Sequence, residues 1–395
     1  CTEGFHDVQL ILDDFLSEMD FAEALSLGAL IAAYTRQGFD INIALSAIGL
    51  YWKLADYTLI TAREAQPGDR PEIVRKMRQE IITTIAPTCM DNRPNIRNTA
   101  LQTLFQILVL QHGGFIFDDY LDTVERVYSL AGKLEHIRVH GYEEGDTTPI
   151  EDEEGIRHHH TRDTVEKQFN ESFCYLLKGM SRLMKLYVAH LQSKVTGGAV
   201  AEYLKMMKSV LKFYGKCLLI KEGKEVPSTV LTLLDEMYGW FEPTTETGMA
   251  LFTLLTGRLL DAVANKDIGL NTEADDVLMA VCNTLISLFN RFSALLLDPD
   301  HSFFTSLLAT LTALITTDGV ALETGAGNKY NTNRPKGKLN STQRLLLQLL
   351  QKMYDQMKDE PRFLIDYKTF TSTIDEMKAT AESLNGSHAN DVFLV

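Results

Sequence analysis

Residues 91–105, with the sequence DNRPNIRNTALQTLF, constrain the fold more than any other stretch of this chain. Asp91 or Asn92 is suited to cap a helix, and Pro94 suits the first turn of that helix. The apolar residues that follow recur at spacings of three and four, which places them on one helical face: Ile96, Ala100, Leu101, Leu104 and Phe105. The segment therefore predicts an amphipathic helix that packs through one apolar stripe.

Arg97 emerges from this apolar stripe close to Asp91 in the sequence. Stacked helical repeats often carry a ladder of Asp and Arg side chains between neighbouring units. We therefore expect Arg97 to lie within reach of an acidic group, either Asp91 or an acid on an adjacent repeat.

The same pattern occurs earlier in the chain. Asn42–Ile48 aligns with Asn95–Leu101, and Tyr51–Trp52 then falls where Leu104–Phe105 falls, at an offset of 53 residues. HEAT and armadillo units usually span about 40 to 47 residues, and a connecting loop around Gln66–Asp69 explains the surplus. A unit of this kind cannot bury its apolar face alone, so two copies at a fixed offset imply stacking.

The apolar segments along the rest of the chain also repeat at three and four residues, and no alternating strand pattern is found. The predicted fold is therefore all-α, a HEAT/armadillo-like α-solenoid of stacked antiparallel helix pairs. We expect helices near residues 4–17, 21–36, 39–63, 70–86, 94–112, 117–137, 162–189, 199–220, 227–241, 245–265, 273–297, 300–317, 341–357 and 366–384.

Changes in composition divide the chain into segments. Polar and acidic residues replace the helical pattern in one segment, and Gly, Asn and basic residues replace it in another. The predicted organisation is HEAT-like repeats over 1–137, an acidic flexible loop over 138–160, further HEAT-like repeats over 161–324, a disordered insertion over 325–340, C-terminal helices over 341–384 and a tail over 385–395.

Charge and cysteine usage exclude several classes of function. The formal net charge is −15 and the pI is about 5.2, whereas nucleic-acid binding and adhesion to anionic lipid by bulk charge need an excess of Lys and Arg. This argument concerns bulk charge and leaves a local basic patch open. The five cysteines are far apart and odd in number, which favours reduced thiols in a cytosolic protein. No apolar run approaches the roughly 18 residues that a membrane span requires. The chain begins at Cys1, and we expect it to be a piece of a longer polypeptide.

The sequence offers no positive sign of catalysis. His158–His160, with His140 upstream, has no ligand spacing such as His-Glu-x-x-His, so we expect no metal site there. His112–Gly114 resembles an esterase oxyanion loop, but the chain contains no Gly-x-Ser-x-Gly motif. Gly325–Lys329 lacks the Gly-Lys-Ser/Thr of a phosphate-binding loop. We therefore predict a protein that is not an enzyme, with no catalytic residues and no cofactor.

Two further sets of residues are candidates for structural or binding roles. Asp163 and Glu166, three residues apart, resemble a capping box at the start of a helix. Four basic residues in the 325–340 segment could contact anionic lipid or an acidic partner, although a solvated linker is the simpler interpretation: Lys329, Arg334, Lys336 and Lys338.

Three segments together resemble the Mon-two family, a group of trafficking scaffolds related to the BIG and GBF exchange factors for Arf GTPases. The segments are 40–57 (DINIALSAIGLYWKLADY), 91–105 and, the most specific, 159–169 (HHTRDTVEKQF). Their order and approximate spacing agree with the family. The chain departs from the family where Phe169 replaces a Trp, where Tyr51 replaces a Leu, and where Arg97–Thr99 replaces a more basic turn.

This resemblance implies a non-catalytic cytosolic scaffold for transport between endosome and Golgi, peripheral on trans-Golgi network and endosome membranes and without a Sec7 domain. The family partners are Dopey-type proteins, Arf-like GTPases and an aminophospholipid flippase. The chain resembles the middle to C-terminal helical part of such a protein. BIG-type proteins share a looser form of the second segment, so the alternative is a regulatory helical region downstream in a BIG/GBF-type Arf exchange factor.

Overall fold

The computed structural model describes residues 2–142, 165–194, 197–220, 223–240, 242, 246–264, 274–296 and 355. The contacts within the chain divide it into two compact units, unit 1 (Cys1–Val210) and unit 2 (Leu211–Val395). The described elements are α-helices with short 3-10 and π-helical turns, and no strand occurs among them. The all-α prediction is therefore confirmed for the part of the chain that the structure describes.

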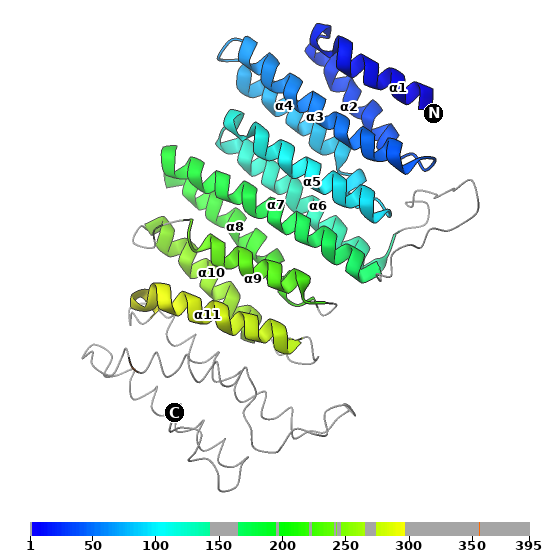
Figure 1. Cartoon of the computed structure of the whole chain (residues 1–395). Helices are drawn as coiled ribbons and strands as arrows, with labels where there is room; N and C mark the ends of the chain where they lie inside the picture. Colours follow the sequence, from blue (N-terminus) through cyan, green and yellow to red (C-terminus); the bar gives the residue numbers. More distant parts are fainter. Residues whose placement is uncertain are drawn as a thin grey trace. The chain divides into compact units, whose positions relative to one another are not determined.

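Unit 1 consists of antiparallel helices (Figure 1). Its elements are α1 (Thr2–Leu10), the π turn η1 (Ile11–Phe15), the 3-10 turn η2 (Leu16–Glu18), α2 (Phe21–Thr35), α3 (Ile41–Glu64), α4 (Arg70–Ile85), the 3-10 turn η3 (Thr88–Met90), α5 (Pro94–Gln111), the 3-10 turn η4 (His112–Gly114), α6 (Phe117–His140) and α7 (Val165–Lys194). The helix α8 (Gly197–Leu218) begins in unit 1 and ends in unit 2.

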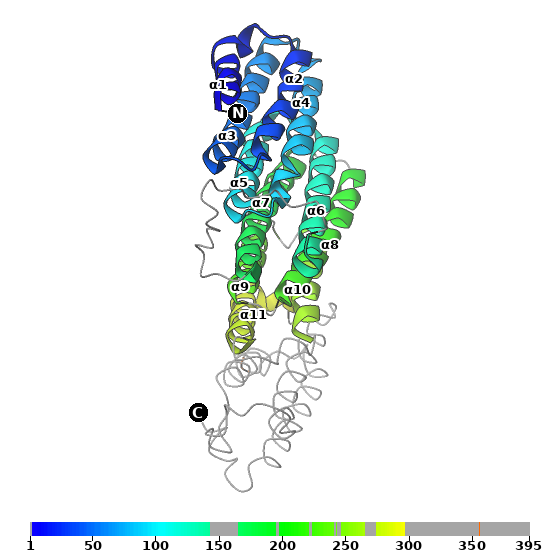
Figure 2. The ribbon, with the colours of Figure 1, turned by 90° about the vertical axis from the view of Figure 1, so that its right-hand side faces the viewer.

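The helices of unit 1 form two layers, seen edge-on in Figure 2. One layer contains α3, α5 and α7, and the other contains α2, α4 and α6. Within the first layer α3 contacts α5 and α5 contacts α7, while α4 contacts both α2 and α6 in the second. Each added helix pair thus extends both layers, which is how stacked repeats share one continuous core.

The offset seen in the sequence corresponds to equivalent helices. The helices α3 and α5 begin 53 residues apart, at Ile41 and Pro94, and they lie side by side in the same layer. The aligned residues Ile43 and Ile96 are both buried. The segments 42–48 and 95–101 therefore play the same structural role in successive repeats of one layer.

Local signals in the sequence set the helix ends. Asp20 and Glu23 form a reciprocal capping box at the start of α2, and the Asp40 carboxylate accepts a bond from the Asn42 amide at the start of α3. Gly141, with φ of 82°, ends α6 in a conformation that favours glycine. The helix α6 thus continues to His140, three residues beyond the predicted end at residue 137.

The helices α5 and α7 approach each other closely at Gly179. A Cβ atom added to Gly179 on α7 would lie 2.1 Å from Cγ of Phe105 on α5, a distance that real atoms do not adopt. Phe105 is itself 4% exposed. The absence of a side chain at residue 179 therefore allows the two helices to approach over the Phe105 ring.

Unit 2 includes the C-terminal part of α8 together with α9 (Glu225–Met237), α10 (Glu246–Ala264) and α11 (Ala274–Leu296). Its core contains edge-to-face contacts of Phe252 with Tyr238 and with Phe292. The Tyr238 hydroxyl lies 3.2 Å from Thr256 Oγ1. Phe292 has φ of −130° and ψ of 27°, so α11 is kinked near its C-terminal end.

Several sequence predictions fall on residues that lie outside the described part of the chain. These are most of the 138–160 loop, the 325–340 insertion, the 385–395 tail, and the predicted helices over 300–317, 341–357 and 366–384, apart from residue 355.

Candidate functional site

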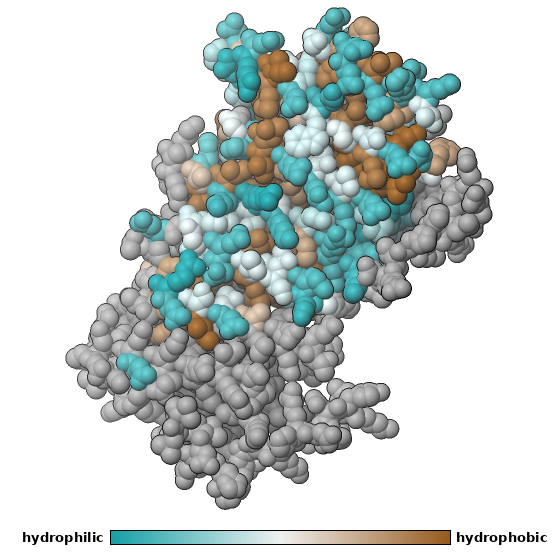
Figure 3. Space-filling model, viewed as in Figure 1, coloured by the Kyte–Doolittle hydropathy of each residue, from teal (hydrophilic) through white to brown (hydrophobic). Residues whose placement is uncertain are grey.

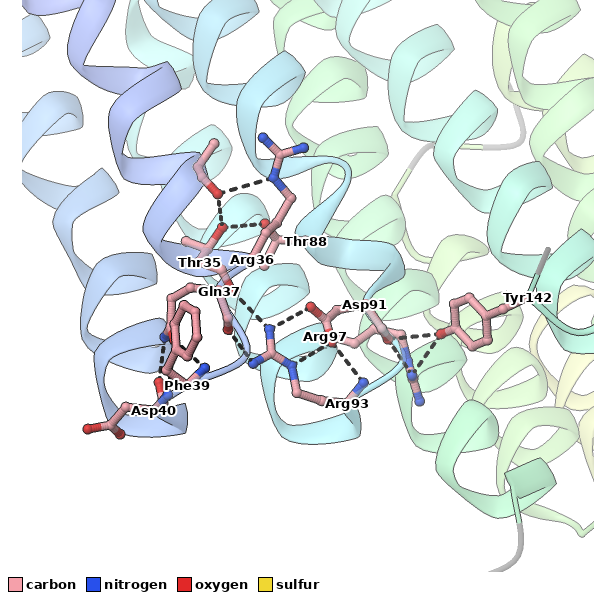
Figure 4. Close-up of polar contacts among 11 residues, drawn as sticks. Thr35, Arg36, Gln37, Phe39, Asp40, Thr88, Asp91, Arg93, Arg97 and Tyr142 are labelled. Carbon is pink, nitrogen blue, oxygen red and sulfur yellow. Dashed lines mark hydrogen bonds and ion pairs between the residues drawn. The ribbon is translucent and has the colours of Figure 1, made fainter. Parts of the chain in front are cut away.

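The candidate site is a polar seam that crosses unit 1 at the N-terminal end of α5. Pro87 follows α4, the turn η3 changes the chain direction, and α5 begins at Pro94. This places Asp91, Arg93 and Arg97 between the α2–α3 connection and α7 (Figure 4). We refer to these three residues and their partners as the arginine seam.

Arg93 joins the start of α5 to the end of α2. It is 6% exposed and binds the Asp91 carboxylate through two bonds, from Nε to Oδ1 at 2.9 Å and from Nη2 to Oδ2 at 2.8 Å. Its guanidinium also donates to the carbonyl oxygens of Thr35 at 3.1 Å and Gln37 at 2.9 Å. A cation here satisfies carbonyl groups that the end of α2 leaves without helical partners.

Arg97 joins α5 to α7. It is 1% exposed, and Nε donates to Ser172 Oγ at 2.8 Å while Nη1 donates to the backbone oxygen of Asp91 at 2.8 Å. Nη2 lies 3.4 Å from the backbone oxygen of Gln168, and the guanidinium carbon is 4.3 Å from the centre of the Phe169 ring. Burial lowers the pKa of this guanidinium.

Arg97 lies within reach of Asp91, but its hydrogen bond to that residue goes to the backbone oxygen and not to the carboxylate. The Asp91 carboxylate is bound by Arg93, and Arg97 takes only the backbone oxygen of Asp91. Asp91 does not cap the first turn of α5 either, because its carboxylate accepts the amide of Arg93, the residue before the helix. Arg97 lies on the buried side of α5, where α7 presents the Ser172 hydroxyl and the Phe169 ring.

Contacts of Tyr142 and of Ser172 with Asn98 extend the arginine seam. The Tyr142 hydroxyl donates to the backbone oxygen of Asp91 at 2.9 Å and lies 3.4 Å from Nη1 of Arg97. The Ser172 hydroxyl donates to Asn98 Oδ1 at 2.5 Å, and Asn98 Nδ2 donates to Glu171 at 3.0 Å. Polar groups of α5 are thus matched along α7, as buried polar groups must be.

A second buried ion pair ties α4 to α6 in the other layer. Arg78 and Asp119 are 0% and 1% exposed, and Nη2 of Arg78 lies 2.7 Å from Oδ1 of Asp119. Arg75 also donates to Asp119, at 3.0 Å, and the amide of Ile116 donates to its other oxygen at 2.9 Å. Burial alone raises the pKa of Asp119, but the bonds from Arg78 and Ile116 outweigh it, so the pKa lies below the ordinary value.

Arg78 is held further by an aromatic ring. Its guanidinium carbon lies 4.5 Å from the centre of the Phe115 ring, within the range of a cation–π interaction. The ion pair and the ring together hold the start of α6 against α4, in the layer opposite α5 and α7.

The buried arginines and their partners have a structural role. Guanidinium groups remain protonated at physiological pH, so they can hold carbonyls, carboxylates and rings but are poor proton-transfer groups. Within the described residues, no group of three or more His, Cys, Asp or Glu side chains could hold a metal ion. Three cysteines of that part of the chain form no disulfide with one another: Cys89, Cys174 and Cys217.

The remaining predicted site residues are described in part or not at all. Glu166 belongs to the first turn of α7, but its side chain lies outside what the structure describes, and so does Asp163. The capping box stays a prediction. The four basic residues predicted to contact lipid or an acidic partner also lie outside the described residues: Lys329, Arg334, Lys336 and Lys338.

The sequence reasoning did not identify Arg93, Arg78, Asp119 or Tyr142 as important. Arg93 could have been found from its position two residues after Asp91, where a local ion pair competes with any longer one. Asp119 could have been found as an acid at the third position of a helix. The sequence holds no signal for Tyr142, because its bond joins residues 51 positions apart.

Comparison with known proteins identifies a family and several relatives that this chain resembles. Residues 81–250 match the model of the C-terminal region of Mon2 protein. "Monensin-resistant homolog 2" of Caenorhabditis elegans is 28% identical over 200 residues, 51% of this chain and 12% of that protein. "Protein MON2 homolog" of Homo sapiens is 25% identical over 206 residues, 46% of this chain and 12% of that protein.

The Drosophila melanogaster protein of the same name is 24% identical over 261 residues, 60% of this chain and 14% of that protein. The chain thus covers a small part, 12% to 14%, of the length of these relatives. The matched region includes Asp91, Arg93 and Arg97 together with their partners on α7. The match over residues 81–250 contains segments 91–105 and 159–169, and with these relatives it supports the resemblance of the chain to the Mon2 family.

Proposed function

We propose that this chain is part of a non-catalytic scaffold for transport between endosome and Golgi, and that it binds protein partners through the surface of its stacked helices. The observation that carries the proposal is the match of residues 81–250 to the C-terminal region of Mon2 protein. The partners that the resemblance suggests are Dopey-type proteins, Arf-like GTPases and a flippase. The setting that it suggests is the cytoplasmic face of trans-Golgi network and endosome membranes.

The fold of unit 1 supports this proposal. Two layers of antiparallel helices expose long helical faces. The arginine seam links α5 to the end of α2 and to α7, and Arg78 links α4 to α6. Within the described residues, no helix is both long and apolar enough to span a bilayer. A stack of this kind presents extended surface, which suits recognition of other proteins.

The exposed hydrophobic residues of unit 1 are the first candidates for partner contact. Phe39 is 73% exposed and Ile60 is 55% exposed, and hydrophobic patches are visible on the face shown in Figure 3. The Gln37 side chain holds the loop that carries Phe39, because its Oε1 accepts the amides of Phe39 at 2.8 Å and Asp40 at 2.9 Å (Figure 4). A ring presented on a fixed loop loses little entropy on binding and is the kind of anchor that interfaces use.

Binding of the full chain to a purified Dopey-type protein and to an Arf-like GTPase, loaded with GDP or GTP, tests the proposal. We expect saturable binding to at least one of them, and a loss of at least about tenfold in affinity for Phe39→Ser or Ile60→Ser, as for a residue at an interface hot spot. Asn42→Ala and Ser46→Ala, on exposed positions of α3, are the matched controls and should bind as the unchanged chain does.

The same reagents separate the scaffold from the exchange-factor alternative. A scaffold leaves the rate of nucleotide release from Arf and Arf-like GTPases at its spontaneous value. Absence of binding to every one of these partners, or an increase in nucleotide release on adding the chain, would show that the proposal is wrong.

A further inference from the structure

The helix α8 carries positive charge that contrasts with the acidic chain. Tyr203–Leu218 contains four lysines and no Asp or Glu, whereas the whole chain has a formal net charge of −15. All four lysines are exposed: Lys205, Lys208, Lys212 and Lys216. The positive charge of α8 is therefore a local feature that the composition of the chain conceals.

The four lysines form one row along the helix. Their spacings of three, four and four residues place them within an arc of about 80° and along a length of about 17 Å. The opposite side of α8 is buried, and there Tyr203 contacts Tyr187 of α7 with ring centres 5.0 Å apart. The division between the two units falls within α8, and the row is a property of this single helix.

The lysines of this row differ from the basic residues that hold unit 1 together. Lys205, Lys208 and Lys212 make no ion pair with any described residue, whereas Arg78 and Arg93 are buried against carboxylates. An exposed charge that makes no ion pair within the described fold is available to an external ligand.

The composition of the exposed side of α8 favours one kind of ligand. Besides the lysines, it exposes only Ala201, Glu202 and Ser209 among the described residues of the helix. Protein interfaces are enriched in Arg and aromatic residues and depleted in Lys. Anionic lipid headgroups, in contrast, attract clustered lysines without needing a fixed geometry. We propose that the lysine row of α8 binds the surface of a membrane that contains anionic lipids.

Screening explains how an acidic chain can bind such a surface. At physiological ionic strength the Debye length is about 8 Å, so acidic residues on distant parts of the chain contribute little repulsion when α8 lies against the headgroups. Each lysine near an anionic surface strengthens binding about fivefold. The three lysines without an ion pair together account for about a hundredfold, an effect that a partition measurement can resolve.

Vesicle flotation with the purified full chain tests the inference. The vesicles contain phosphatidylcholine with about 30 mol% phosphatidylserine, compared with phosphatidylcholine alone. We expect binding to the anionic vesicles only, weakening as salt rises from about 50 to about 300 mM. The triple variant Lys205→Gln, Lys208→Gln, Lys212→Gln should partition about a hundredfold more weakly, and the corresponding Lys→Arg triple should bind as well as the unchanged chain.

A variant with the same change in net charge serves as the control. Lys178, Arg182 and Lys185 are exposed on α7, and replacing all three by Gln should leave partition within about twofold of the unchanged chain, since the row on α8 is intact. Equal loss in the two triples would mean that net charge alone drives binding, and the proposal would be wrong. Flotation could instead fall only when the four basic residues of the 325–340 segment are neutralised: Lys329, Arg334, Lys336 and Lys338. This result would assign the membrane contact to that segment and overturn the proposal.

If the true ligand of α8 were an acidic protein, the Lys→Gln triple would bind vesicles as well as the unchanged chain does. This result too would refute the proposal. The inference rests on the proposed peripheral location for its setting. Its test contains only protein and lipid, whereas the proposed function is tested by binding of purified protein partners. Failure of one therefore leaves the other open to its own measurement.

Discussion

Replacing Arg97 by alanine should weaken the contact between α5 and α7 by about 3 kcal/mol. The change removes two short hydrogen bonds, to Ser172 Oγ and to the backbone oxygen of Asp91, each worth about 1 kcal/mol net. It also removes the cation stacked on the Phe169 ring, worth about 1 kcal/mol. The two contacts at 3.4 Å, to Gln168 and Tyr142, are long and add little.

Hydrogen exchange measured by mass spectrometry suits this prediction, because it reports the stability of one contact within a chain of two units. A loss of about 3 kcal/mol corresponds to exchange more than about a hundredfold faster at residues 168–172 of α7. Asn95→Ala changes an exposed residue in the first turn of α5 and should alter protection there by less than about 0.5 kcal/mol.

The coupling between the two helices can be isolated with a double-mutant cycle. Arg97→Ala and Ser172→Ala remove the two ends of one bond, so together they should cost less than the sum of the single changes by about 1 kcal/mol. If Arg97→Ala alters protection at residues 168–172 by less than threefold, the guanidinium does not hold α7 and the reasoning fails.

Three further predictions concern buried contacts. Gly179→Ala should destabilise unit 1 by about 1–3 kcal/mol, because the added Cβ meets Phe105. Gly132→Ala on α6 has open space around it and should stabilise unit 1 by up to about 1 kcal/mol. Urea unfolding measures both changes, and midpoints that move in the same direction for the two variants would contradict this prediction. Arg93→Ala should lower the free energy of unfolding, measured with urea, by about 3 kcal/mol, because it removes the cation that binds the buried Asp91 carboxylate. The double variant Arg93→Ala, Asp91→Ala should lower the free energy of unfolding by less than Arg93→Ala alone. The pKa of Asp119 is lower in the folded than in the unfolded chain, so its ion pair stabilises the fold above about pH 4, and this stabilisation falls as the pH drops further. The free energy of unfolding of Asp119→Asn, measured with urea, should therefore depend less on pH below about pH 4. An unchanged pH dependence would count against the ion pair.

The helices could be predicted from the sequence because their determinants are local. The spacing of apolar residues fixed α5 to within one residue of the predicted range 94–112, and Pro94 begins it. The repeat offset of 53 residues also follows from local patterns, because α3 and α5 have the same need to bury one side. Residues near a helix end that could continue the helix were harder to assign, as the extension of α6 to His140 shows.

The partners of the buried arginines could not be predicted, because they depend on packing between distant segments. Arg97 meets Ser172 across 75 positions, and Arg78 meets Asp119 across 41. The sequence showed that Arg97 stands beside an apolar stripe, but an arginine there can turn toward solvent, an acid or a neighbouring helix. Only the position of α7 decides among these.

The arrangement of the seam also explains why two of the segments that resemble the Mon2 family belong together. Segment 91–105 supplies Asp91 and Arg97, while segment 159–169 supplies the Phe169 ring on which Arg97 stacks and the Gln168 carbonyl that Nη2 approaches. A buried guanidinium without these partners would carry a large desolvation cost, so a change in one segment requires a change in the other. The two segments are therefore parts of one contact between α5 and α7, and the stack that presents the surfaces of this chain depends on both.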